Sequence, residues 1–300
     1  LIQTRPQQEL AKTNSAALFL CGQCLPNRWR HNTLPSIASP SRGTPTAIHF
    51  HMSILELMKY AVFGDIHSNL EALTTVLDAA RKESVDQFLC LGDIVGYNAN
   101  PAECLALVRE LDCEIIVKGN HDHQASIKTD LQGFNPQAAV AISWTREQLS
   151  EESCQWLSGL PYQSTLSSKA TLVHATLDNP HSWGYIFDRF TAGACISYQF
   201  TPLCFYGHTH IPLVFEKFGE VRDGTRYEDV VLKPGHKYLF NAGSVGQPRD
   251  GDPRASFVTY DTEERRVVLH RLEYDVEKAQ QKVLKAGLPE RLAHRLSNGR

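Results

Sequence analysis

The sequence predicts an α/β fold built around a parallel sheet. From Met58 onward, apolar runs of strand length alternate with segments of helical spacing, and residues 59–65 are apolar enough for a strand that is buried on both faces. The opening order of strand, helix, strand, helix and strand implies right-handed crossovers between parallel strands. Ligands of such sheets bind beyond the carboxyl ends of the strands, so we expect the functional residues there.

The expected elements follow in order along the chain. Asn100 precedes Pro101, which is typical of a helix N-cap followed by the first helical position. Residues 237–242 and 255–274 show the alternation of a hairpin-rich sheet. The expected helices are residues 69–83, 100–112, 136–159 and 275–287. The expected strands are residues 59–65, 85–93, 114–120, 164–177, 203–218, 237–242 and 255–274.

Composition excludes several classes of partner and favours a reducing compartment. A net charge of -3 and a pI near 6.5 give no bulk attraction to a nucleic-acid polymer or an anionic membrane. No apolar run approaches the ~18 residues of a membrane span. The eight cysteines are scattered, several of them in apolar runs, as buried free thiols are, which predicts a cytoplasmic protein. Cys21 and Cys24 form a lone C-x-x-C motif without a second pair, so we expect no function from it.

Residues 1–57 differ in character from the rest of the chain. They are rich in Pro, Ser, Thr, Gln and Asn, show no sustained period, and carry five Lys and Arg against two Glu. We expect a disordered or loosely docked extension. A non-native leader is favoured because the run that begins at Met58 resembles a natural start, and a targeting extension is the alternative. Residues 58–300 are expected to form one domain.

Five apolar runs each end in residues that can bind a metal. Three of them end in Gly64-Asp65-Ile66-His67, Gly92-Asp93 and Gly119-Asn120-His121-Asp122. Two later runs end in His174 and in Gly207-His208-Thr209-His210. Asp65 and His67 are two residues apart and project to the same side if the extended conformation continues. Buried carboxylates and imidazoles are costly unless they are paired or metal-bound, so the five ends need a shared compensating charge.

The ordered blocks GD-x-H, GD, GNH-D, a lone His and GH-x-H closely resemble the calcineurin-like metallophosphoesterase superfamily, over residues 58 to about 275. The resemblance implies a four-layer αββα sandwich with a dinuclear metal site at the strand ends, the ions lying roughly 3.5–4 Å apart. Carried over to this chain, it places Asp65, His67 and His210 on the first metal. It places Asn120, His174 and His208 on the second metal, with Asp93 bridging the two.

The chemistry of these donors agrees with the resemblance. Carboxylates and imidazoles suit Mn, Fe, Zn, Ni or Co, of which we favour Mn, better than Mg alone or Ca. Two cations that share a water would lower its pKa and supply a bridging hydroxide for in-line attack on phosphorus. His121 would stand beside the metals and stabilise the phosphoryl group or protonate the leaving oxygen. Asp122 would orient the His121 imidazole.

The resemblance predicts a metal-dependent hydrolase of phosphomonoesters or phosphodiesters. Nucleotide-like substrates are favoured, as for a phosphodiesterase or a dinucleoside polyphosphate hydrolase. The enzymatic alternative is a serine/threonine phosphoprotein phosphatase, but Gly96–Pro101 lacks the Asp-Arg pair that such enzymes carry there. The other alternative is a non-catalytic scaffold like the retromer subunit of this superfamily, in which missing ligands would be expected. The expected partner is thus a small phosphorylated molecule, with a phosphoprotein as the alternative.

Three residues outside the blocks are candidates for substrate contacts. Asn98 lies in the loop after Asp93. His181 lies in the segment directly after His174, which either overhangs the metals or is a structural loop. Arg249 ends the run that begins at Asn241, where backbone amides and a guanidinium suit a phosphate, although a turn with a surface arginine is the alternative.

Overall fold

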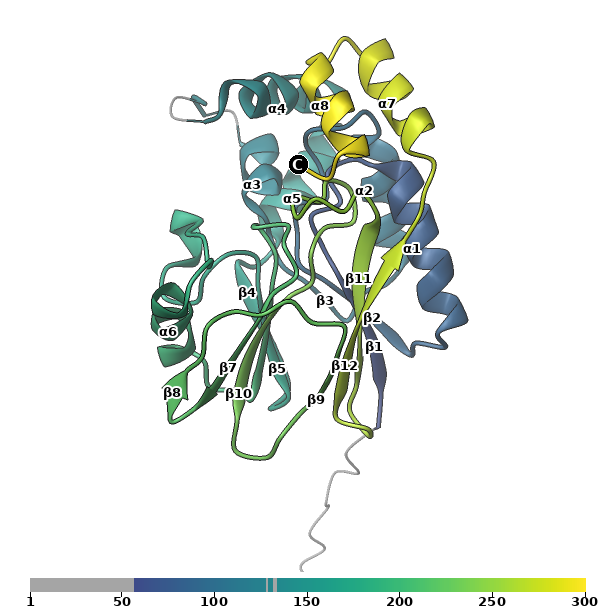
Figure 1. Ribbon diagram of the computed structural model, residues 1–300. Helices are drawn as coiled ribbons and strands as arrows, with labels where there is room; N and C mark the ends of the chain where they lie inside the picture. The colour runs from purple at the N-terminus through teal and green to yellow at the C-terminus, as the bar shows by residue number, and fades with distance from the viewer. Residues whose placement is uncertain (1–56, 128, 132–133) are drawn as a thin grey trace, which may run out of the picture. The chain divides into compact units, whose positions relative to one another are not determined.

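The computed structural model describes residues 57–300 except residues 128, 132 and 133 (Figure 1). The expectations for residues 1–56, and for the pair Cys21 and Cys24 within them, therefore lie outside the described residues. No helix in the described part of the chain is long and apolar enough to cross a membrane.

Within the described residues, the strands form two six-stranded sheets that face each other (Figure 1). The first sheet has the order β3 (Ile115–Ile116), β2 (Gln87–Cys90), β1 (Lys59–Phe63), β11 (Ala255–Asp261), β12 (Arg266–Leu272) and β9 (Asp229–Val231). The second has the order β4 (Gln163–Leu166), β5 (Ala170–Val173), β6 (Leu203–Tyr206), β10 (Lys237–Asn241), β7 (Val214–Phe218) and β8 (Glu220–Val221). In the first sheet β1, β2 and β3 are parallel, and in the second β5, β6 and β10 are parallel.

Helices cover the outer face of each sheet, which gives the predicted αββα sandwich. α1 (Leu70–Lys82) and α2 (Pro101–Glu110) lie on the first sheet, and α6 (Arg189–Ser197) lies on the second, whereas α7 (Val276–Lys285) packs against α1 at the end of the sandwich (Figure 1). α3 (Asn120–Ser126), α4 (Pro136–Gln148), α5 (Glu151–Gly159) and α8 (Glu290–His294) lie toward the end of the sandwich at which the parallel strands finish (Figure 1). The two short 3-10 helices are η1 (Pro180–Ser182) and η2 (Arg295–Ser297).

The alternation of side chains along β1 explains why this strand is apolar throughout. Tyr60 and Val62 pack between the two sheets with Phe205 and Phe240, whereas Phe63 packs on the other face against α1 and α2. Successive side chains of a strand point to opposite faces, so a central strand of this sandwich has no solvent face. The prediction that this apolar run forms a strand buried on both faces is confirmed.

Several expected elements differ from the observed ones. The third strand is shorter than expected because the chain turns into α3 at Asn120, where the Asp122 carboxylate accepts the N–H of Gly119. The expected strands over residues 164–177 and 203–218 each contain two strands. α6 was not predicted, although Asp188 accepts the N–H groups of Phe190 and Thr191 as a helix N-cap does.

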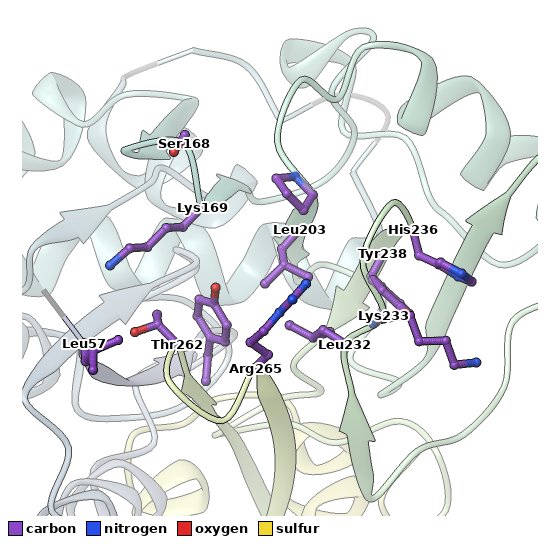
Figure 2. Close-up of a pocket in the computed structure, with 12 residues that line it drawn as sticks. Leu57, Ser168, Lys169, Leu203, Leu232, Lys233, His236, Tyr238, Thr262 and Arg265 are labelled. Carbon is purple, nitrogen blue, oxygen red and sulfur yellow. Dashed lines mark hydrogen bonds between the residues drawn. The ribbon is translucent and has the colours of Figure 1, made fainter. Parts of the chain in front are cut away.

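A cavity of about 270 Å³ lies at the edge of the sheets where the parallel strands begin. It is lined by Leu203, Tyr238 and Tyr260 and by the basic side chains of Lys169, Lys233 and Arg265 (Figure 2). Among the described residues, the groups of side chains that could hold a metal lie instead at the edge where the parallel strands end.

Candidate metal centre

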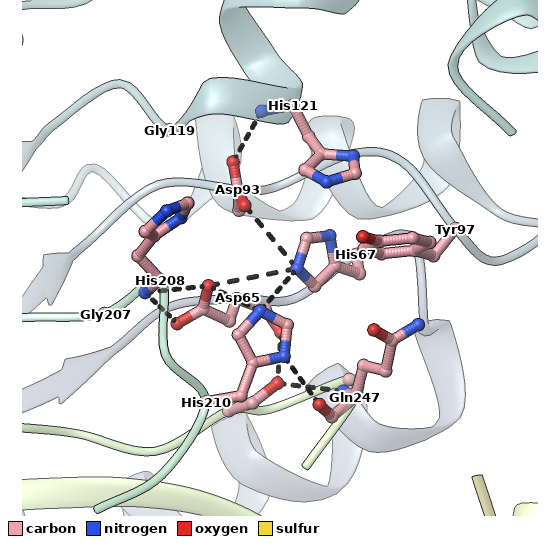
Figure 3. Close-up of polar contacts among 12 residues, drawn as sticks. Asp65, His67, Asp93, Tyr97, Gly119, His121, Gly207, His208, His210 and Gln247 are labelled. Atoms are coloured by element: carbon pink, nitrogen blue, oxygen red, sulfur yellow. Dashed lines mark hydrogen bonds and ion pairs between the residues drawn. The ribbon is translucent and has the colours of Figure 1, made fainter. Parts of the chain in front are cut away.

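The candidate ligands gather where parallel strands of both sheets end. Asp65 and His67 follow β1, Asp93 follows β2, and His208 follows β6 (Figure 3). The main-chain N–H of His208 donates to both carboxylate oxygens of Asp65, at 3.2 and 3.0 Å, so one carboxylate joins the ends of the two sheets. Because the parallel strands of both sheets end at this edge, residues far apart in sequence share one site.

The candidate ligands form two groups that have one carboxylate in common. Ligand atoms of Asp65, His67, Asp93 and His210 lie within 4.8 Å of one another, and so do those of Asp93, His174 and His208. In the first group, Asp65 Oδ1 is 3.2 Å from His210 Nε2. In the second, Asp93 Oδ2 is 3.3 Å from His174 Nε2. The grouping has Asp93 in the shared position that the sequence predicted for the bridging ligand.

Each of the four clustered histidines has one ring nitrogen beside a main-chain carbonyl. Nδ1 of His67, His174 and His210 lies near the carbonyls of Val95, Leu91 and Gln247, and Nε2 of His208 lies near that of Trp183, at 2.6–3.2 Å. A ring nitrogen beside a carbonyl must donate, so the other nitrogen of a neutral ring carries a lone pair. The carbonyls thereby turn the lone pairs toward the site, which is how metal-binding imidazoles are oriented.

Lone pairs directed at one another are unfavourable unless something positive lies between them. Nε2 of His67 and Nε2 of His210 are 3.2 Å apart. Nε2 of His174 and Oδ1 of Asn120 are buried and have no hydrogen-bond partner among the described residues. Such orphaned acceptors beside two carboxylates fit divalent cations of the kind that imidazole and carboxylate bind together. The donor set therefore fits two ions with Asp93 beside both.

The pKa values of the clustered residues also indicate that the cluster favours positive charge near its carboxylates. Burial would raise the pKa of Asp93, but the imidazoles of His174 and His121 outweigh it and hold that pKa well below its usual range. Burial would lower the pKa of His174, but Asp93 outweighs it and raises the value to about 9. The carboxylates of the cluster therefore favour positive charge beside them. Burial, with the adjacent His174, lowers the pKa of His208 to about 3.

The backbone at the ligands is strained. Asp65, His67, Asp93, His208 and His210 have φ between 48° and 65°, a region that residues other than glycine rarely adopt. The condition under which Asp65 and His67 would project to the same side, an extended strand through both residues, is therefore not met. The two side chains meet because the chain turns at both residues, and the hydrogen bonds from Asp65 N to Gly92 O and from His67 N to Asp93 O hold that turn against the loop after β2.

Asp122 has a different role from the one expected. Its carboxylate accepts the main-chain N–H groups of Ile94, Val95 and Gly119, at 2.8, 3.2 and 3.0 Å, and it does not contact the His121 imidazole by a hydrogen bond. The expected orienting contact fails because consecutive side chains on a helix do not face each other. Asp122 instead ties the start of α3 to the loop that carries Asp93.

His121 is held beside the metal ligands by packing. Its main-chain N–H donates to Asp93 Oδ1 at 2.8 Å, and its ring lies 4.7 Å from that of His67 and 4.4 Å from that of Tyr97. A Cβ on Gly96 would lie 2.4 Å from His121 Nδ1, so only glycine leaves room for this ring. Nδ1 is buried without a hydrogen-bond partner among the described residues, and burial lowers the pKa of the ring to about 4.

A cavity of about 210 Å³ opens onto this centre. Arg249, a predicted substrate contact, lines it together with Asn120, His121 and other site residues. Asn98 does not: it is buried, and its side-chain amide donates to the carbonyl of His67 at 2.8 Å. His181 is exposed and packs on Tyr162, with ring centroids 3.8 Å apart. The overhanging segment contributes Trp183 and Tyr185 instead.

Four aromatic side chains of the cavity were not predicted: Tyr97, Phe134, Trp183 and Tyr185. Tyr97 could have been suspected, since it lies in the loop after Asp93. Trp183 and Tyr185 lie in the segment after His174 that was expected either to overhang the metals or to be a structural loop, although neither residue was named as a contact. Phe134 comes from a loop that no local pattern marks.

Comparison with known proteins places the chain among phosphoesterases. The model of the calcineurin-like phosphoesterase superfamily domain matches residues 58–265. An uncharacterized protein of Methanocaldococcus jannaschii is 40% identical over 245 residues, which cover 80% of this chain and 98% of that protein. The structure of a metallophosphoesterase from Sphaerobacter thermophilus is similar at a TM-score of 0.72 and 39% identity, over 81% of this chain and 100% of the other. A hypothetical protein from Pyrococcus horikoshii shares the fold at 20% identity and a TM-score of 0.67, over 81% and 98% of the two chains.

Proposed function

Because this chain belongs to the calcineurin-like phosphoesterase superfamily and is a metallophosphoesterase, we propose that it hydrolyses phosphomonoester or phosphodiester bonds of small nucleotide-like molecules. The family depends on two metal ions. The observation that carries the proposal is that two groups of metal-binding side chains share Asp93 at the floor of one cavity. A phosphate ester in that cavity would meet both groups at once.

We assign the first ion to Asp65, His67 and His210, and the second to Asn120, His174 and His208, with Asp93 between them. Two divalent ions held there would lower the pKa of the attacking water and offset negative charge on the phosphoryl oxygens. Mn is favoured by the mixture of carboxylate, amide and imidazole donors. The carbonyls behind the imidazoles keep the ligand nitrogens in place before any ion binds.

His121 and Arg249 are the side chains that would contact the phosphoryl group. His121 lines the cavity, so its ring can donate to a phosphoryl or leaving-group oxygen. Arg249 lies across the same cavity, and a guanidinium binds phosphate oxygens through paired hydrogen bonds. Both would stabilise charge that develops on the substrate while the bond to the leaving oxygen breaks.

Aromatic side chains at the rim support a nucleotide-like substrate. Tyr185 is 48% exposed and stacks on His208, with ring centroids 4.2 Å apart, and on Phe187, which is 52% exposed. Flat exposed rings beside a phosphate site suit a nucleobase, because every base offers a stacking face.

We also propose a cytoplasmic location. Cys90, Cys104 and Cys204 are buried and form no disulfide, and burial raises the pKa of each thiol well above its usual range. Unoxidised buried thiols are typical of a reducing compartment.

The test is a panel of phosphate mono- and diesters, measured with Mn, Ni, Co, Zn and Mg while the metal content of the purified protein is determined. We expect hydrolysis of at least one ester class, with Mn among the activating metals. A protein that binds no metal and hydrolyses none of these esters would be a scaffold, and the proposal would be wrong.

A further inference from the structure

Several arginines gather in a second cavity beside the candidate metal centre. This cavity has a volume of about 640 Å³ and shares Tyr97, Asn135, Tyr185 and Arg249 with the metal cavity. Most of its remaining wall comes from the C-terminal segment, where α8 and η2 supply Arg291 and Arg295. Figure 1 places α8 at the end of the molecule at which the strands of the metal site finish. A ligand that enters the metal cavity can therefore extend into the arginine pocket, which we define by Arg249, Arg291 and Arg295.

The positive charge in the arginine pocket is not balanced by side-chain carboxylates. The guanidinium carbons of Arg249 and Arg295 lie 5.7 and 5.9 Å from the centroid of the same Tyr97 ring. Arg249 donates to Gln247 Oε1 at 3.0 Å, and its Nε has no partner among the described residues. Nε of Arg295 donates to an oxygen of Arg300, the last residue described, so this group already has one oxygen partner. In the described part of the chain, no Asp or Glu side chain lies within ion-pair distance of the three arginines.

Three arginines elsewhere in the protein show the opposite arrangement. Arg254, Arg266 and Arg271 each lie against an aspartate. Bringing like charges together in a half-buried place costs free energy, and burial with the neighbouring Arg249 lowers the pKa of Arg295 to about 10. An anion between the two guanidinium groups would remove that cost.

Packing of the C-terminal helix does not require these charges. Leu292, Ala293 and Leu296 are buried, and the first two pack against Ala138 and Val283. Arg291 is exposed. The helix is thus held by its apolar face, and the arginines lie on the side that faces the cavity.

We propose that the arginine pocket binds a second phosphoryl group of the substrate, so that the enzyme selects esters of diphosphate or polyphosphate over esters that contain one phosphorus atom. This inference rests on the proposed function, because the first phosphoryl group must lie at the metal centre. Arg249 lines both cavities and lies between the two phosphoryl positions. Guanidinium groups suit this task because their paired N–H donors match phosphate oxygens.

The first experiment measures binding without turnover. Titration calorimetry on the Mn-loaded protein compares inorganic pyrophosphate with orthophosphate, for the wild type, Arg295→Gln, Arg295→Lys and the control Arg81→Gln. Arg81 lies on α1 and pairs with Asp78 on the surface. We expect pyrophosphate to bind the wild type and Arg81→Gln about tenfold more tightly than orthophosphate, and Arg295→Gln to lose that preference. Arg295→Lys should retain part of it, since the charge remains.

The second experiment measures the ratio of kcat/KM for diadenosine tetraphosphate to kcat/KM for bis(p-nitrophenyl) phosphate. Arg295→Gln should lower this ratio about tenfold, mainly through a higher KM for the polyphosphate, and Arg81→Gln should not change it. Thermal unfolding shows whether the variant is folded. If Arg295→Gln is destabilised, Arg291→Gln replaces it with the same expected result.

The two proposals fail in different ways. A folded Arg295→Gln that keeps both the pyrophosphate preference and the substrate ratio would overturn the second phosphoryl site, whereas hydrolysis of either ester would leave the proposed function standing. If neither ester is hydrolysed, the full panel of mono- and diesters decides the proposed function, and the pyrophosphate titration alone decides whether the arginine pocket binds a diphosphate.

Discussion

Replacing Gly119 by alanine tests whether the position of Asp93 controls the site. Gly119 has φ -91° and ψ 171°, which alanine adopts without strain, so any effect must come from the added methyl group. That methyl carbon would lie 2.0 Å from Asp93 Oδ1 and 2.3 Å from Asp93 N, whereas contacts under 3.0 Å essentially never occur. Asp93 must therefore move by about 1 Å, a displacement that costs about 100-fold in catalysis when it affects a reacting group.

The assay compares kcat/KM and bound metal with those of Gly159→Ala. Gly159 ends α5, and a methyl carbon added there would have nothing within 4 Å, so it is a matched glycine-to-alanine control. We expect Gly119→Ala to lose about 100-fold in kcat/KM and to bind less metal, with a stability cost of about 1–3 kcal/mol. Gly159→Ala should behave as the wild type. Wild-type activity and metal content in Gly119→Ala would refute the reasoning.

Three further predictions concern the candidate metal site and one ionisable group outside it. His121→Ala should keep its bound metal but lose about 100- to 10,000-fold in kcat, as expected for a group that acts on the substrate; metal analysis beside kinetics checks this. Removing metal with a chelator should lower the melting temperature by about 5–10 °C, because ions at 100 times their Kd add about 2.7 kcal/mol, and added Mn should restore it; calorimetry showing no change would contradict a metal at these lone pairs. Burial would raise the pKa of Glu216, but hydrogen bonds from His236 and Tyr238 outweigh it and lower that pKa below its ordinary value of 4.5. Its contribution to stability is thus present above about pH 4.5 and is lost as the pH falls through the folded-state pKa, so urea unfolding should show the gap between wild type and Glu216→Gln narrowing from pH 6 to pH 3.5.

The fold and the cluster of candidate metal ligands were accessible from the sequence because both depend on short patterns. An apolar run followed by glycine and a polar residue marks a strand end, and parallel strands bring their ends to one edge. The family resemblance of the ordered blocks then grouped Asp65, His67 and His210 around the shared Asp93. The turns at Asp65 and His67 were not accessible, since residues other than glycine rarely take positive φ and no local signal announces it.

The surroundings of the ligands were harder to predict because they depend on contacts between distant segments. Asp122 binds N–H groups of Ile94 and Val95, which lie on another loop. Adjacency in sequence suggested His121 as its partner, but helix geometry directs the two side chains apart. Arg295 lies more than 40 residues after Arg249, and only the folded chain brings both to Tyr97.

The measurement that bears most directly on the shared-ligand site is the number of metal ions per chain in the wild type and in Asp93→Asn, with hydrolysis measured on the same samples. Asp93 belongs to both ligand groups and has a buried carboxylate. We predict about two ions per chain in the wild type, and in Asp93→Asn fewer ions together with a loss of about 100-fold or more in turnover, since the amide does not neutralise two cations. Two bound ions with wild-type turnover in Asp93→Asn would contradict the account.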